Sequence, residues 1–169
     1  PEPQPEPPAP QPEPQPEPPP IRPTEEPAPL KGSPACLILS AKSLEALLPG
    51  GSFRMEDRGP AVDGESSCRW SRARDAIGVS LTLLEGVAIS SAAESASAYF
   101  DQLEGPGPEN GIETLAGVGE RAYLQTLGSG DYATYSLSIL KGERIVFLNL
   151  TGTGREAAIK LGLAAAKGM

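Results

Sequence analysis

The residues able to do chemistry in this chain are carboxylates, arginines and two cysteines, because the sequence contains no histidine. Serine–histidine and cysteine–histidine nucleophile systems are therefore excluded. Carboxylates lie close together at three places: Glu56 with Asp57, Asp63 with Glu65, and Glu109 with Glu113. All three places are polar loops, where solvated surface carboxylates are the ordinary interpretation. We expect a non-enzymatic protein that uses no cofactor and no metal.

The most concentrated basic feature is a group of three arginines around the single tryptophan: Arg69, Arg72 and Arg74 around Trp70. Arginine beside an indole suits recognition of a carboxylate, a sugar or a partner protein. The alternative interpretation is a core tryptophan packed against a disulfide, with the arginines in solvent. Arg69, Trp70, Arg72 and Arg74 are the candidate ligand- or partner-binding residues of this sequence.

The two cysteines, Cys36 and Cys68, are far apart in the sequence and do not form a C-x-x-C motif. Zinc binding is a poor interpretation, since no histidine is present to complete a site. Two isolated cysteines also fit buried thiols in a cytosolic protein. The proline-rich tract at the start of the chain favours an extracytoplasmic setting and a Cys36–Cys68 disulfide.

The 169 residues divide into two parts of different composition, because 16 of the 20 prolines lie in residues 1–34. Residues 1–20 repeat Pro-Glu-Pro and Pro-Gln-Pro and offer almost no apolar side chain to bury. We expect residues 1–34 to form a disordered spacer rich in polyproline II, or a ligand for a proline-recognising groove. Residues 35–169 are expected to form a single globular domain.

The net charge of −8 and the absence of a basic run argue against binding to nucleic acid or anionic lipid by charge alone. No segment approaches 18 consecutive apolar residues, so no membrane span is expected. The chain starts at Pro1, within a repetitive tract, and we expect an upstream portion to provide a membrane anchor.

Side-chain periodicity predicts a strand-rich domain. Alternating apolar residues over 134–140 and 144–150, joined by a turn at Gly142, follow a shorter strand over 122–127. Further strands are predicted over 53–56, 67–71 and 77–84. Helices are predicted after Ser40 as N-cap and after capping boxes at Ser91–Glu94 and Thr153–Glu156. This order predicts an α+β fold, an antiparallel sheet packed by two or three helices.

Three short patterns resemble small cell-envelope lipoproteins of actinobacteria that have no assigned function. These are Cys36 before a Leu-rich helix, Cys68-Arg69-Trp70 on a strand, and Gly117-Val-Gly-Glu-Arg-Ala-Tyr123. The long Pro/Glu/Gln tract departs from that family and is similar to the periplasm-spanning spacers of envelope proteins in other bacteria. The resemblance implies an exported domain with a paired-cysteine framework, and it implies no activity.

We therefore expect an extracytoplasmic domain, periplasmic or on the cell surface, that the spacer holds away from its anchor. Its expected partner is an envelope protein or a cell-wall component. The alternative is the extracellular sensor domain of a membrane-tethered signalling protein, such as a receptor kinase.

Overall fold

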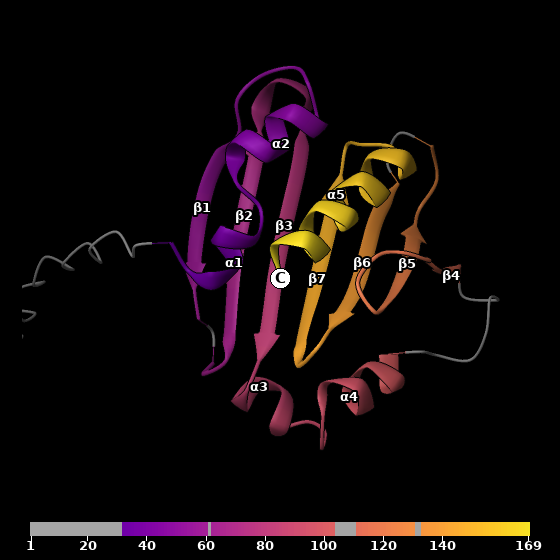
Figure 1. Cartoon of the computed structure of the whole chain (residues 1–169). Helices are drawn as coiled ribbons and strands as arrows, with labels where there is room; N and C mark the ends of the chain where they lie inside the picture. The colour runs from indigo at the N-terminus through magenta and orange to yellow at the C-terminus, as the bar shows by residue number, and fades with distance from the viewer. Residues whose placement is uncertain (1–31, 61, 104–110, 131–132) are drawn as a thin grey trace, which may run out of the picture.

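The computed structural model describes residues 32–60, 62–103, 111–130 and 133–169. Within these ranges the chain forms one seven-stranded antiparallel sheet, five helices and a short 3-10 turn (Figure 1). The predicted α+β class is thus confirmed. The spacer predicted over residues 1–34 lies outside the described residues, except for its last three positions.

The sheet joins two local meanders edge to edge. The order of strands across it is β1-β2-β3-β7-β6-β5-β4, with every neighbouring pair antiparallel. The central contact pairs β3 with β7, with Leu81 opposite Leu148, and brings together segments far apart in the sequence. The strands are β1 (Arg54–Gly59), β2 (Glu65–Arg72), β3 (Ile77–Glu85), β4 (Ile112–Thr114), β5 (Arg121–Leu127), β6 (Thr134–Lys141) and β7 (Arg144–Thr151).

The helices form two groups on the sheet: α1 (Pro34–Ile38), α2 (Ala41–Leu47) and α5 (Arg155–Gly168) in the first, and α3 (Val87–Ser90) and α4 (Ala96–Leu103) in the second. Figure 1 shows the first group in front of the strands and the second beyond the lower ends of β3 and β7. Among the residues that the structure describes, these two groups leave much of the rear face of the sheet without a covering helix.

The main core lies between the sheet and the first group of helices. Alternation along each strand turns every second side chain towards this layer, so that Trp70, Leu81, Leu137 and Leu148 are fully buried there. A smaller cluster lies on the rear face under α3 and α4. It contains Leu84, Ile89, Ala96, Phe100, Tyr123, Leu140 and Ile145.

Local signals for helix α2 and for the last hairpin are confirmed. The Ser40 hydroxyl accepts a hydrogen bond from the Ser43 amide at 3.0 Å and caps α2. Gly142 has a φ of 57°, so this turn uses a backbone conformation that favours glycine, and it connects β6 to β7 as the alternation predicted.

Both predicted capping boxes are wrong in detail. Ser91 follows the separate helix α3, and its amide bonds back to the Val87 carbonyl. Ser95 caps the next helix instead, because its hydroxyl accepts from the Ala98 amide at 3.1 Å. The N-cap of α5 is Gly154, which has no side chain to offer. Both motifs therefore marked nearby helices without supplying the caps.

Candidate binding site on the open sheet face

The part of the rear face that α3 and α4 leave uncovered is polar; we call it the open face. Antiparallel register places its side chains in rows across the strands. The first row runs from β1 to β5 through Glu56, Arg69, Ser80, Asn149, Ser136 and Gln125. The next row runs through Ser71, Gly78, Thr151, Thr134 and Leu127.

The open face contains a depression of about 300 Å³ that is lined by residues of β1, β2, β3 and β7. Gly78 helps to hollow it, because a β-carbon at that position would lie 2.8 Å from the Thr151 hydroxyl oxygen. The lining consists of Arg58, Ser67, Cys68, Arg69, Gly78, Val79, Ser80, Thr82, Asn149 and Thr151.

The lining is rich in hydrogen-bond donors and holds two guanidinium groups with no carboxylate. Arginine only donates, whereas serine, threonine and asparagine can both donate and accept. The rest of the domain is acidic: residues 32–169 have a net charge of −4, since the whole chain has −8 and residues 1–31 carry six Glu against Arg22 and Lys31. The depression is therefore a locally positive region that fits an anionic, acceptor-rich ligand.

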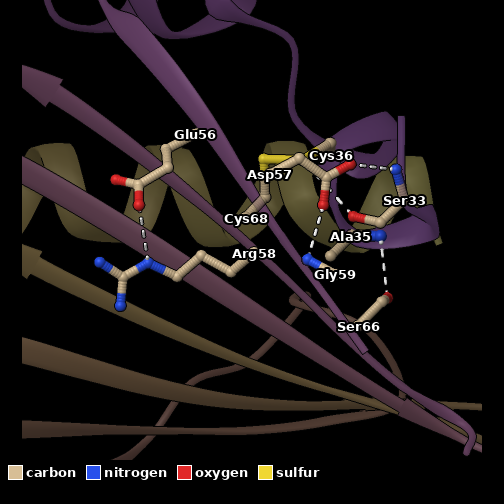
Figure 2. Close-up of a disulfide and its surroundings, with 9 residues drawn as sticks. All are labelled: Ser33, Ala35, Cys36, Glu56, Asp57, Arg58, Gly59, Ser66 and Cys68. Atoms are coloured by element: carbon tan, nitrogen blue, oxygen red, sulfur yellow. Dashed lines mark hydrogen bonds and ion pairs between the residues drawn. A yellow bond between two sulfur atoms is a disulfide. The ribbon is translucent and has the colours of Figure 1, made fainter. Parts of the chain in front are cut away.

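The two arginines of the depression are available to a ligand. Arg58 pairs with Glu56 through an Nε–Oε1 distance of 3.5 Å, with both side chains about half exposed (Figure 2). Exposed pairs of this kind contribute about 0–1 kcal/mol, so replacing Glu56 by another anion costs little. Arg69 is exposed and forms no ion pair with any residue that the structure describes. In the register of β1 and β2, Glu56 lies directly opposite Arg69, so Arg58, Arg69 and Glu56 together carry one net positive charge.

The four candidate residues around Trp70 do not form one surface. Alternation along β2 places Arg69 on the open face and turns Trp70 and Arg72 to the opposite side. Trp70 is fully buried, and its Nε1 is the buried side-chain nitrogen that lacks a hydrogen-bond partner in the described part of the chain. Arg74 is exposed in the 3-10 turn Ala73–Asp75. Of the four, only Arg69 lines the depression.

Arg72 holds the fold together at the end of β2. Its side chain is 5% exposed and donates to the Leu48 carbonyl at 2.6 Å and to both carboxylate oxygens of Asp75. Its guanidinium also lies 4.8 Å from the centre of the Phe53 ring. The hydrogen bond from Arg72 lowers the pKa of Asp75 below its ordinary value. Arg72 is thus a structural residue, unsuited to meeting a partner in solvent.

The predicted disulfide is present: Cys36 of α1 is bonded to Cys68 of β2 (Figure 2). Both residues are buried, at 5% and 1% exposure. The bond ties the short first helix to the second strand. The resulting covalent link holds the start of the domain against the helix-covered face of the sheet, on the opposite side from the depression.

Asp57 fixes the chain just before α1. One carboxylate oxygen accepts from the Ser33 amide at 2.6 Å and the other from the Gly59 amide at 2.9 Å (Figure 2). Burial acts to raise the pKa of Asp57, but these hydrogen bonds to the charged form outweigh it and lower the pKa. The entry of the chain into the domain is therefore anchored on β1.

The carboxylates that lie close together in the sequence do not point toward one another in the structure. Glu56 and Asp57 are neighbours on β1, but Glu56 points to Arg58 and Asp57 points to the disulfide side (Figure 2). Glu113 pairs with Arg155 at the start of α5, and Glu109 lies outside the described residues. Asp63 is exposed in the turn before β2, and Glu65 begins that strand.

The sequence reasoning missed Ser80, Thr82 and Asn149 as part of a site. Alternation of Ser and Thr along β3 showed that one face of this strand was polar. The pairing of β3 with β7 places Asn149 beside Ser80. This pairing joins segments far apart in the chain, and it cannot be predicted from the local sequence of either strand.

Comparison with protein-family models and with curated proteins finds no match to this chain. Among the described residues, no helix is long and apolar enough to cross a membrane. No group of three or more acidic or cysteine side chains within the described ranges is arranged to hold a metal ion.

Proposed function

We propose that this chain is an extracytoplasmic binding domain of the cell envelope, held away from its anchor by the proline-rich tract, and that it binds through the open face. The partner is an envelope protein or a cell-wall component. It meets the depression with an anionic group that pairs with Arg69 and Arg58.

One observation carries this proposal: a donor-rich, positive depression lies on the uncovered face of an otherwise acidic domain. Its lining residues include no Asp, Glu, Lys or Tyr, and Cys68 is in the disulfide. Hydroxyl, amide and guanidinium groups suit hydrogen bonding and charge pairing. The groups at this site therefore support binding better than acid–base chemistry.

The disulfide supports the proposed extracytoplasmic location. Disulfides form and persist in oxidising environments outside the cytoplasm and are rare inside it. A buried Cys36–Cys68 bond in a domain of this size is therefore consistent with an exported protein.

The proposal is tested by co-sedimentation of the purified full chain with two probes from the source organism: isolated peptidoglycan sacculi and a detergent extract of envelope proteins. For the extract, light-induced cross-linking from a photoreactive amino acid at Ser80 identifies the partner. Arg69→Glu is expected to lower the bound fraction about tenfold or more, because it replaces attraction with repulsion at a close charge pair.

Arg74→Glu is the matched control, since it makes the same change of charge at an exposed arginine that does not line the depression. It should leave binding unchanged. Equal binding by wild type and Arg69→Glu would overturn the assignment of the open face. Equal loss in both variants would show that only the overall charge of the domain matters, and would also overturn it.

A further inference from the structure

We infer that the open face also binds the chain's own Pro-Glu tract, residues 1–20. The tract then has a second role besides that of a spacer, because it occupies the depression until an external partner displaces it. This inference goes beyond the proposed function, and it requires only the open face and the tract of this chain.

The tract matches the depression in charge and in hydrogen bonding. Residues 1–20 contain 12 prolines, four Glu and three Gln, with no Lys or Arg, and so carry a net charge of −4. Proline has no N–H, so such a chain presents mainly carbonyl and carboxylate acceptors. The lining of the depression offers Arg58, Arg69 and a set of hydroxyl and amide groups as donors. Acceptors therefore meet donors, and the negative tract meets two arginines whose charge the single carboxylate of Glu56 only partly offsets.

The chain enters the domain beside the strand that borders the depression. The Ser33 amide is held by Asp57 on β1, between Glu56 and Arg58 (Figure 2). The open face lies on the other side of this edge strand. From β1 to β7 is three strand spacings, or about 14 Å at roughly 4.8 Å each. Residues 21–31 can span about 34 Å at roughly 3.1 Å per residue when extended, so the connection is long enough.

The energetics suit a contact that can be displaced. Each exposed charge pair contributes only about 0–1 kcal/mol. Tethering raises the effective concentration of the tract at the face to the order of millimolar, where half occupancy needs about 4 kcal/mol. Two charge pairs together with a few hydrogen bonds of about 1 kcal/mol each supply an amount of that order. An external partner with better-placed anions competes directly for Arg69. Salt weakens the intramolecular contact, since its charges are in solvent.

The inference is tested by paramagnetic NMR on the full chain carrying a nitroxide at Gln11→Cys. The native cysteines do not take the label, because they are bonded and buried. The backbone amide signals of Arg69, Ser80 and Asn149 are expected to lose intensity relative to that of Lys42, which lies in α2 on the opposite side of the sheet. Addition of 0.5 M salt should restore much of that intensity.

Charge reversal provides the matched variants. Arg69→Glu should restore the signals of Ser80 and Asn149, and changing the four tract glutamates to lysine in that background should bring the loss back. Arg74→Glu should change nothing. Should Arg69→Glu fail to fold, Arg69→Gln removes the positive charge without adding a negative one, and should restore the same signals in part.

Three results would overturn the inference. The amide signals of the open face could keep their intensity, or they could lose it equally in wild type and Arg69→Glu. The loss of intensity could also arise only when spin-labelled chains are mixed with separate isotope-labelled chains. The last would assign the contact to a second copy. None of these bears on capture of sacculi or envelope proteins, so the two proposals fail independently. A docked tract with no external partner would support this inference alone.

Discussion

Arg72 and Asp75 form an ion pair in which only one partner is buried: Nη2 and Oδ2 lie 2.7 Å apart, with the arginine 5% and the aspartate 41% exposed. Arg72 also donates to the Leu48 carbonyl. The pair joins the end of α2 to the turn between β2 and β3. Arg72, which the sequence suggested as a binding residue, is thus buried and stabilises the fold.

Arg72→Ala is expected to lower the free energy of unfolding by about 2–3 kcal/mol, because it leaves the buried Leu48 carbonyl without its donor and removes the packing of the arginine side chain against Phe53. Urea denaturation measures this. Arg74→Ala, at the exposed arginine two residues further along, should stay within about 0.5 kcal/mol of wild type. Similar costs for the two changes would contradict the structural role of Arg72.

Reduction of Cys36–Cys68 should cost about 3–4 kcal/mol of stability, because the bond closes a loop of 32 residues in the unfolded chain. The measurement compares urea unfolding of the oxidised protein with that of Cys36→Ala/Cys68→Ala. Intact mass after alkylation is the accompanying check: the denatured protein should add no label before reduction and two labels after it. Labelling of fresh, unreduced protein would contradict the bond.

Asp57 should make stability depend on pH in the acid range. Its pKa is lowered in the folded state, so its contribution is present above the unfolded value near 3.8 and is lost as pH falls below that value. The stability difference between wild type and Asp57→Asn should therefore shrink as pH falls from 6 to 3. Subtracting the variant removes the contributions of other carboxylates. A difference that stays constant with pH would contradict the prediction.

Gly162→Ala should destabilise the protein, although alanine favours helix over glycine by about 1 kcal/mol. A β-carbon at this position in α5 would lie 2.6 Å from a methyl carbon of Leu137 in β6. Overpacking of this kind costs about 1–3 kcal/mol. Thermal unfolding measures the net effect. In a Leu137→Ala background, which removes the obstructing methyl group, Gly162→Ala should become neutral or stabilising.

The last hairpin shows what local sequence can determine. Alternation along residues 134–140 and 144–150 and a glycine between them specify two antiparallel strands, because side chains that alternate can bury one face only as strands. Alternation likewise predicted the strand over residues 77–84, and a serine before residues at helical spacing predicted the N-cap at Ser40. The Cys36–Cys68 bond was also predicted, because the chain has only two cysteines and its proline-rich tract favours an oxidising, extracytoplasmic setting.

Tertiary structure decided which residues form the candidate site. Whether Arg69 or Arg72 faces solvent depends on which side of β2 the helices pack, and both sides carry arginine or serine in the sequence. The position of Asn149 beside Ser80 depends on the pairing of β3 with β7. This pairing closes a long loop, and neither strand carries a local sequence signal that specifies its partner. Likewise, the sequence suggests only that Gly162 destabilises its helix, whereas the structure shows that Leu137 leaves no room for a β-carbon there. Residue type and period are local properties that the sequence carries, whereas the neighbour across a sheet or under a helix is set by the packing of the whole domain.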